Sequence, residues 1–300
     1  MQLETSSKQA PIVPWQDGYS TSFVTSQDGT TIGYRQLGHG PGVVLLHGAA
    51  SSGYNHLQLA EALADTFTVY LADRRGRGLS GPYHVGDNLQ TEVDDLEALL
   101  RNTGACNIFG VSAGAIICLQ AALTLPIIRK AAIYEPPLSV SSSALTTLLP
   151  RYESEIAQGK LAAALITGMK AAEMGPPLFN ALPRWLLEFA VRMQIKSEDK
   201  KGAGGYVPMR EIAPTLHYDF QLVTEISNSM ENFRALHSEV LLIGGSTSPA
   251  YLKASLDALE RVLPHATRIE LPGVGHAASW NRDRGGQPVP VAQALQQFFA

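Results

Sequence analysis

The sequence has few cysteines and no cluster of like charges. Its 300 residues include only two cysteines, Cys106 and Cys118, and both lie in apolar stretches, where a free thiol is the usual state. We therefore expect no disulfide bond. The 23 Lys and Arg residues against 27 Asp and Glu residues give a formal net charge of −4. Since no Lys/Arg-rich run of the kind that follows a phosphate backbone is present, we expect no nucleic-acid partner.

Long apolar runs and metal-binding motifs are also missing. The apolar stretch 110–125 is interrupted by Ser112, Gln120 and Thr124, whereas a membrane-spanning helix needs about 18 apolar residues. The N-terminal residues are acidic and polar where an export signal has a basic start and an apolar stretch. No H-E-x-x-H motif or closely spaced Cys and His set occurs. We predict a soluble, cytoplasmic protein with no membrane partner, no metal and no cofactor; its oligomeric state stays open.

The residues that are present alternate between strand-like and helix-like segments. Residues 21–37 hold two β-rich stretches around Asp28-Gly29, a strong hairpin signal. Short apolar runs typical of strands buried on both faces then alternate with helical segments. This doubly wound pattern predicts an α/β fold with a mostly parallel eight-stranded sheet and helices on both faces. After the hairpin, the expected strands include 42–48, 67–73, 105–110, 129–135, 239–245 and 267–273, and the expected helices include 88–102, 113–125, 250–263 and 288–299.

The strand-like segments stop in the middle of the chain and then resume. Residues 139–236 are expected to be mainly helical, with glycine- and proline-rich breaks. We predict that they form a helical cap, or lid, inserted into one α/β core that consists of residues 21–138 and 237–300. Residues 1–20 are expected to be an N-terminal extension.

A candidate nucleophile lies at one strand-to-helix junction. Gly110-Val111-Ser112-Ala113-Gly114 follows an apolar strand and precedes an apolar helix, which is the context that a G-x-S-x-G nucleophile requires. A sharp turn there would project the Ser112 hydroxyl above the sheet, and the flanking glycines would leave room for neighbouring backbone. The N–H groups of Ala113 and Ala49 are the expected oxyanion donors.

The expected general base is a histidine late in the chain. His276 follows the last expected strand in a loop whose glycines, Gly273 and Gly275, let it reach over the sheet edge. His47, at the end of a buried strand, is expected to be a hydrogen-bonded structural residue. Four other histidines, His84, His217, His237 and His265, lie in polar contexts and are expected to be solvated.

The third catalytic group, a carboxylate, is harder to identify from the sequence. The loop after the strand that follows the cap, residues 244–250, contains no carboxylate. Asp257 lies further on, within a helix, and its spacing predicts a surface ion pair with Arg261. Glu135, at the end of the strand before the cap, is the preferred candidate to orient His276. The alternative is that Glu135 bonds local backbone while Asp219 or water orients the histidine.

Together these segments resemble the α/β-hydrolase superfamily, over nearly the whole chain. The motifs that carry the resemblance are His-Gly at 47–48, DRRGRGLS at 73–80, GVSAG at 110–114, YEPP at 134–137 and GVGH at 273–276. A glutamate taken from the strand before the cap also gives a partial resemblance to zearalenone-type lactone hydrolases. That resemblance implies a Ser112, Glu135 and His276 triad.

Three residues are candidates for a substrate pocket. Ala50 is small enough to let a substrate approach, and the cap aromatics Trp185 and Tyr218 could line a pocket for a bulky lactone. The alternative for Trp185 is that its helix-spaced apolar neighbours pack the cap onto the core. In the DRRGRGLS motif, Asp73, Arg74 and Arg75 are expected to form a structural ion-pair cluster.

The leading functional hypothesis is a serine hydrolase that cleaves a small carboxylic ester or lactone through an acyl-enzyme on Ser112. On the same scaffold, haloperoxidase or perhydrolase chemistry, cofactor-free dioxygenation and C–C bond hydrolysis remain alternatives. Outside enzymology, the alternative is a ligand-binding receptor on a hydrolase scaffold. The missing carboxylate in residues 244–250 would favour such a receptor.

Overall fold

The computed structural model describes residues 18–138, 142–171, 182–201, 204–226 and 230–300. An eight-stranded sheet runs through it in the order β1-β2-β4-β3-β5-β6-β7-β8. The strands β1 and β2 form the expected antiparallel hairpin, β2 pairs antiparallel with β4, and all later pairs are parallel. The strands are β1 (Ser20–Thr25), β2 (Thr31–Leu37), β3 (Gly42–Leu46), β4 (Thr68–Ala72), β5 (Asn107–Val111), β6 (Lys130–Tyr134), β7 (Glu239–Gly245) and β8 (Ala266–Leu271).

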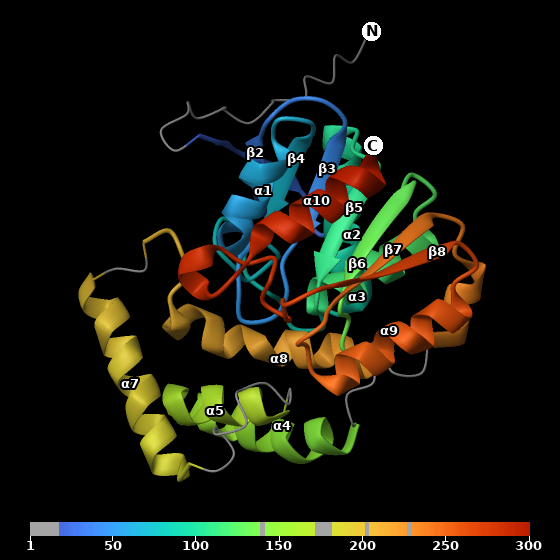
Figure 1. The fold of residues 1–300 in the computed structure, drawn as a ribbon. Helices are drawn as coiled ribbons and strands as arrows, with labels where there is room; N and C mark the ends of the chain where they lie inside the picture. The colour runs from blue at the N-terminus through green and yellow to red at the C-terminus, as the bar shows by residue number, and fades with distance from the viewer. Residues whose placement is uncertain (1–17, 139–141, 172–181, 202–203, 227–229) are drawn as a thin grey trace, which may run out of the picture.

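Helices cover both faces of this sheet, as its alternating buried side chains require. Val44 and Leu46 of β3 belong to a core cluster shared with α2 and α3, whereas Val43 and Leu45 belong to one shared with α1 and α10. The expected α/β-hydrolase-type architecture is confirmed, and Figure 1 shows its layers. The flanking helices are α1 (Leu57–Leu63), α2 (Leu89–Thr103), α3 (Ala113–Thr124), α9 (Ala250–Val262) and α10 (Pro288–Phe299), with short 3₁₀ turns η1 (Gly53–His56), η2 (Met230–Ala235) and η3 (Arg282–Arg284).

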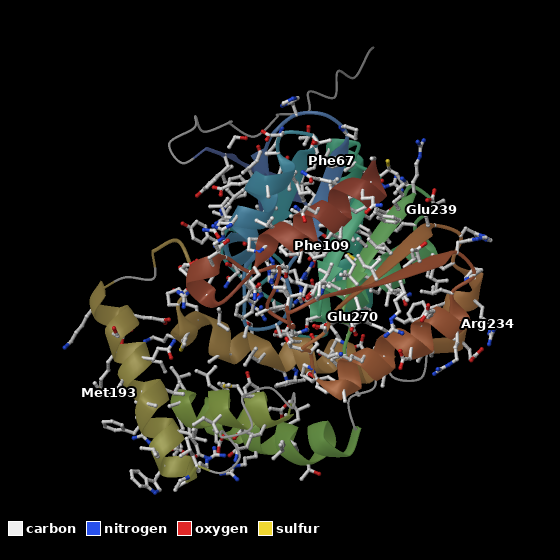
Figure 2. The ribbon with its side chains drawn as sticks, viewed as in Figure 1. Phe67, Phe109, Met193, Arg234, Glu239 and Glu270 are labelled. Carbon is white, nitrogen blue, oxygen red and sulfur yellow. The ribbon has the colours of Figure 1, made fainter. Side chains whose placement is uncertain are left out.

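Aromatic side chains fill the layer between the sheet and α10. Phe67 and Phe109 are both buried (Figure 2). The Phe67 ring meets the ring of Phe299 from α10 edge to face, with 6.2 Å between centroids, an arrangement that aromatic pairs favour. Phe109 of β5 belongs to the same core cluster as these two rings, so β5 packs on this face of the sheet as well.

Between β6 and β7 the described chain is helical. It contains α4 (Ser142–Ala157), α5 (Leu161–Ala171), α7 (Arg184–Lys201) and α8 (Met209–Ile226). In Figure 1, α8 lies between the sheet and the α4 and α5 pair. Two side chains of α8, Leu222 and Ile226, join the core cluster of α3, whereas Leu216 and Phe220 join a cluster with α4 and α5. Helix α8 thus contacts both the α/β core and the rest of the insertion.

The strand order brings two loops together at the centre of the sheet. The chain passes from β3 to β4 on one side and then to β5 on the other side of β3. In open parallel sheets, such a reversal opens a crevice at the carboxyl ends of the two strands. The loop after β3 and the turn after β5 therefore meet there, and these are the segments that carry Ala49 and Ser112.

Candidate active site

Ser112 lies in a strained turn between β5 and α3. Its φ of 56° and ψ of −121° are unusual for a residue with a side chain, and such a conformation costs about 1–3 kcal/mol. Its N–H donates to the carbonyl oxygen of Tyr134 at 2.9 Å, so the turn is tied to the end of β6. Ala113 begins α3, which places the free N–H groups of the first helical turn beside the serine.

The glycines of this turn allow backbone segments to approach closely. A Cβ on Gly110 would lie 2.4 Å from the Gly114 carbonyl oxygen, and one on Gly114 would lie 2.5 Å from that of His47. A Cβ on Gly48 would lie 2.9 Å from the Cβ of Ser112. The loop after β3 is therefore pressed directly against the candidate nucleophile.

Glu135 and His276 are in direct contact. The Nδ1 of His276 lies 2.8 Å from the Oε2 of Glu135. The carboxylate is fully buried, and the imidazole is one-fifth exposed. The other oxygen, Oε1, accepts the Gly245 N–H at 2.6 Å. Since the Ser112 N–H bonds to Tyr134, the residue before Glu135, the serine and this pair lie at the ends of adjacent strands.

Further contacts hold the His276 loop, and they are made by residues that the sequence did not indicate. The Tyr134 hydroxyl donates to the Gly275 carbonyl oxygen at 2.8 Å. The Nδ1–H of His56 donates to the Ser279 carbonyl oxygen at 3.0 Å, and the Asn281 side chain donates to that of Tyr54 at 2.8 Å. Burial lowers the pKa of His56 to about 4, so this histidine is neutral. No sequence motif singles these residues out, because they act through backbone carbonyls.

The alternative carboxylates are engaged elsewhere. Asp219 is buried and binds the guanidinium groups of Arg74 and Arg77, at 2.8 and 2.6 Å, which rules out the alternative in which it orients His276. Asp257 forms a surface ion pair with Arg268, so the predicted pairing with Arg261 is wrong. The reason is that the neighbouring strand β8 presents Arg268 across the helix surface, a contact that helical spacing cannot reveal.

His47 is buried beneath the loop after β3. Its Nε2 accepts the Arg74 N–H at 3.0 Å, and its Nδ1–H donates to the Gly48 carbonyl oxygen at 2.9 Å. Burial, together with the charges of Arg74 and Arg77, holds its pKa well below the usual value. His47 is therefore a neutral structural residue, as predicted from the sequence.

The loop after β3 carries the predicted oxyanion donor. Ala49 and Ala50 are half-buried and pack against the apolar cluster formed by α4, α5 and α8. Ala50 has a φ of 52°. In the described chain, Ala50, Ser112 and Glu135 are the non-glycine residues with positive φ. Ser112 and Glu135 directly follow β5 and β6, and Ala50 lies in the loop after β3. Such strain gathers at functional sites.

The two predicted aromatic pocket residues differ in their surroundings. Trp185 is 70% exposed on α7, so the structure places it neither in a pocket nor in the packing of the insertion. The reason is its phase on the helix, because Leu187, Val191 and Ile195 take the inner face. On the outer side, Met193 is also exposed (Figure 2). Tyr218 is half-buried, and its ring stacks on the ring of Tyr83 at 3.7 Å between centroids.

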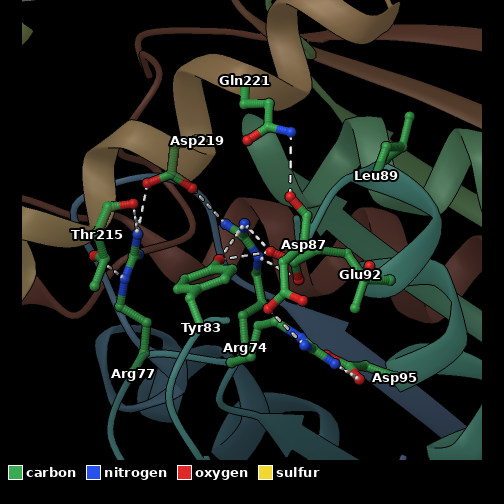
Figure 3. Close-up of polar contacts among 12 residues, drawn as sticks. Arg74, Arg77, Tyr83, Asp87, Leu89, Glu92, Asp95, Thr215, Asp219 and Gln221 are labelled. Atoms are coloured by element: carbon green, nitrogen blue, oxygen red, sulfur yellow. Dashed lines mark hydrogen bonds and ion pairs between the residues drawn. The ribbon is translucent and has the colours of Figure 1, made fainter. Parts of the chain in front are cut away.

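The DRRGRGLS segment forms a buried ion-pair cluster behind the loop after β3, as expected (Figure 3). Its partners could not be identified from the sequence, because they come from distant parts of the chain: the β1–β2 turn, β2, the loop before α2, α2 itself and α8. The ion pairs are Asp73–Arg35, Arg74–Glu92, Arg74–Asp219, Arg75–Asp28, Arg75–Asp87, Arg75–Asp95 and Arg77–Asp219.

Within the described ranges, no group of three or more His, Cys, Asp or Glu side chains is arranged to hold a metal ion. In the same part of the chain, no helix is long and apolar enough to cross a lipid bilayer. Both cysteines are free thiols, with Cys118 buried and Cys106 half-buried.

The chain matches a known protein family and is similar in sequence to several known hydrolases. The sequence pattern described as "Alpha/beta hydrolase family" matches residues 43–294. The chain is 26% identical over 249 residues to 2-(acetamidomethylene)succinate hydrolase of Mesorhizobium japonicum, covering 82% of this chain and 85% of that one. It is 27% identical over 266 residues to pimeloyl-[acyl-carrier protein] methyl ester esterase of Xanthomonas axonopodis pv. citri, covering 88% and 97%.

Solved structures are similar over the whole fold. An alpha/beta hydrolase from Sphaerobacter thermophilus superimposes with a TM-score of 0.76 at 29% identity, covering 93% of this chain and all of that one. A thermophilic esterase from Thermogutta terrifontis, at 19% identity, gives 0.67 and covers 97% and 98%. With a family pattern that spans most of its length, this chain belongs to the alpha/beta hydrolase family and is an enzyme of the hydrolase class.

Proposed function

We propose that the protein is a serine hydrolase that cleaves a small carboxylic ester or lactone, with Ser112 as nucleophile, His276 as general base and Glu135 as the orienting acid. The observation that carries this proposal is the 2.8 Å hydrogen bond between the His276 Nδ1 and the buried Glu135 carboxylate, one strand away from the strained Ser112 turn. These are the roles that serine, histidine and a carboxylate have in a catalytic triad for acyl transfer.

The Glu135 contact fixes the protonation pattern of His276. A carboxylate can only accept a hydrogen bond, so the imidazole carries its proton on Nδ1. The Nε2 atom then has a free lone pair and takes the proton of the Ser112 hydroxyl as its oxygen attacks the substrate carbonyl. The resulting imidazolium is stabilised by Glu135, and it returns the proton to the leaving alcohol.

The backbone supplies the remaining stabilisation. The N–H groups of Ala113 and Ala49 would hold the oxyanion that forms on the attacked carbonyl. Water, activated by the same histidine, then adds to the acyl-enzyme, releases the acid and regenerates the Ser112 hydroxyl. Every proton is thus transferred through His276, and the reaction needs no metal and no cofactor.

For the substrate class, we propose a neutral ester or lactone enclosed beneath the helical insertion, residues 139–236, acting as a cap. The apolar cluster of α4, α5 and α8 packs against Ala49 and Ala50, which gives the oxyanion loop an apolar cover. One relative is by name a methyl ester esterase, which supports an ester. The position of Glu135, directly after β6, resembles that of the acid in zearalenone-type lactone hydrolases and therefore supports a lactone.

We also propose that the enzyme works in the cytoplasm on a small molecule. Two free thiols in the chain are compatible with a reducing compartment. The receptor alternative loses its motivation, because the carboxylate missing from residues 244–250 is replaced by one that contacts His276 from β6.

The test is covalent labelling. Purified protein is incubated with a fluorophosphonate, and its intact mass is measured beside the Ser112→Ala and His276→Ala variants. We expect one adduct on the wild-type protein, none on Ser112→Ala, and labelling of His276→Ala slowed by at least about 10²-fold, the lower end of the contribution of a general base. An unlabelled wild-type protein, or a Ser112→Ala variant that labels equally fast, would refute the proposal.

A further inference from the structure

The loop that carries Ala49 is held at both of its ends by one neighbouring segment. At its start, the backbone N–H of Arg74 donates to the His47 Nε2 at 3.0 Å. At its end, the Arg77 guanidinium donates through Nη1 to the Ser51 carbonyl oxygen at 3.0 Å. The strained Ala50 lies between these two anchors. The direction of the Ala49 N–H therefore depends on where Arg74 and Arg77 are held.

Both arginines are held by one carboxylate on α8. The two oxygens of Asp219 bind the Arg74 Nη1 at 2.8 Å and the Arg77 Nη2 at 2.6 Å. Arg77 also donates through Nε to the Thr215 hydroxyl, one turn earlier on the same helix, at 2.5 Å. Figure 3 shows Thr215 and Asp219 reaching from α8 to the guanidinium groups. The helix is thereby connected to the oxyanion loop through two side chains.

This connection is buried and balanced in charge. Arg74 and Arg77 supply two positive charges, and Asp219 and Glu92 supply two negative charges. All four side chains are at most 3% exposed. Burial alone would raise the pKa of Asp219, but the charges of Arg77 and Arg74 outweigh burial and lower it. A displacement of α8 relative to the loop would leave these buried charges unpaired, which is costly.

We propose that Arg77 and Asp219 are positioning residues, through which α8 sets the direction of the Ala49 N–H in the oxyanion hole. The inference rests on the proposed function, because it assigns a task to residues around that same site. Arg77 and Asp219 act through the loop backbone and touch no reacting atom. An insertion helix that shifts away from the sheet would therefore release the strained Ala50 conformation and misdirect the oxyanion donor.

The sharpest test replaces Arg77 with lysine and compares it with the same change at Arg75. Both arginines are buried, and both bind several partners. The partners of Arg75, however, are Asp28, Asp87 and Asp95, and none of them lies in the loop after β3. Lysine keeps the charge but not the fork of donors, so Arg77→Lys loses the contact with Ser51. Arg75→Lys is the matched control.

We expect Arg77→Lys to lower kcat for an ester substrate about 10- to 100-fold with little change in KM, because an oxyanion donor acts mainly in the transition state. Its affinity for a trifluoromethyl ketone, which forms a tetrahedral oxyanion on the serine, should fall by the same factor. Arg75→Lys should keep kcat within about threefold of wild type, even where thermal unfolding shows an equal loss of stability.

A milder variant keeps the test decisive if Arg77→Lys does not fold. Thr215→Val retains the Arg77–Asp219 ion pair and removes one acceptor of the charged guanidinium, so we expect kcat about tenfold lower, outside the range allowed for the Arg75→Lys control. The proposal is overturned if the folded variants at 77 and 215 keep the kcat of the Arg75→Lys control, or if KM alone changes. Fluorophosphonate labelling of wild-type Ser112 is measured first, because its absence would refute the proposed function rather than the positioning role.

Discussion

The Glu135 carboxylate accepts one hydrogen bond through each of its oxygens. Oε1 is engaged by the Gly245 N–H at 2.6 Å, and Oε2 by His276 at 2.8 Å. The side chain is fully buried, so bulk water cannot replace either hydrogen-bond donor. Because Gly245 is a backbone donor with a fixed position, it also determines how an uncharged substitute at position 135 must orient.

This arrangement makes the effect of Glu135→Gln specific. The amide oxygen must face Gly245, so the amide NH₂ group faces the His276 Nδ1 and selects the tautomer that is protonated on Nε2. That tautomer cannot accept the Ser112 proton, and we expect kcat to fall about 10³- to 10⁴-fold. Steady-state kinetics give the loss, and ¹⁵N NMR of the His276 ring reports the tautomer. A loss smaller than tenfold would argue that another group orients the histidine.

At the same scale, the identities of the three candidate triad residues could be read from the sequence, but their supporting residues could not. Ser112 and His276 follow from local motifs, and Glu135 was chosen because residues 244–250 lack a carboxylate. His56 and Asn281 act by donating to backbone carbonyls across more than 220 residues of chain. Nothing in their local sequence indicates such contacts.

Among the elements, α3 packs closely against the end of β3. The backbone of Gly114, in its first turn, lies against the carbonyl oxygens of Leu46 and His47 at the end of β3, where a Cβ would come within 2.6 Å of both. Helix α3 can therefore start only where it does if residue 114 has no side chain. By contrast, Gly168 in α5 has Phe220 as its nearest neighbour, and a Cβ there would lie 3.3 Å from the end of that ring.

This contrast predicts opposite outcomes for the same substitution. Gly114→Ala should lower the free energy of unfolding by about 2 kcal/mol or more, because rigid backbone must shift to accept the methyl group. Gly168→Ala should leave it unchanged within about 1 kcal/mol, since alanine is the better helix former and the ring can adjust. Urea denaturation of both variants decides the matter. Equal losses would mean that the close approach at α3 is not a constraint.

The boundaries of helices and strands were largely predictable from the sequence. Which side of each insertion helix is buried was not. The expected segments 88–102 and 239–245 correspond to α2 (Leu89–Thr103) and β7 (Glu239–Gly245), because their apolar periodicity is strong. In α7, the apolar residues exceed what one buried face can hold, so the sequence did not show that Trp185 and Phe189 would be exposed. Contacts between distant elements decide such cases.

For the molecule as a whole, two buried histidines couple stability to pH. Burial lowers the pKa of His56 to about 4 and that of His47 well below its usual value. In the unfolded chain both return to about 6.5, so between these values the unfolded state binds more protons than the folded state. Their contribution to stability is complete above pH 6.5 and is lost as the pH falls through that window.

We therefore expect mild acid, between pH 6.5 and pH 4, to destabilise the protein through these two histidines. His56 alone should account for about 3 kcal/mol between pH 6.5 and pH 4. His56→Asn keeps a donor for the Ser279 carbonyl but removes the titration, so its stability should fall less steeply over this range. Urea unfolding at half-unit pH steps measures both slopes. Parallel curves for the two proteins would contradict the assignment.

The order of the segments around the site also has a consequence for the synthesis of the chain. The proposed oxyanion loop, the candidate nucleophile and Glu135 all lie before residue 136, but the candidate base His276 follows β8, the last strand of the described residues. A nascent chain emerging from the ribosome could assemble the core strands while its serine still lacks a base. Hydrolysis would begin only when the C-terminal segment docks, so an incomplete chain would carry the reactive serine in an inert form throughout translation.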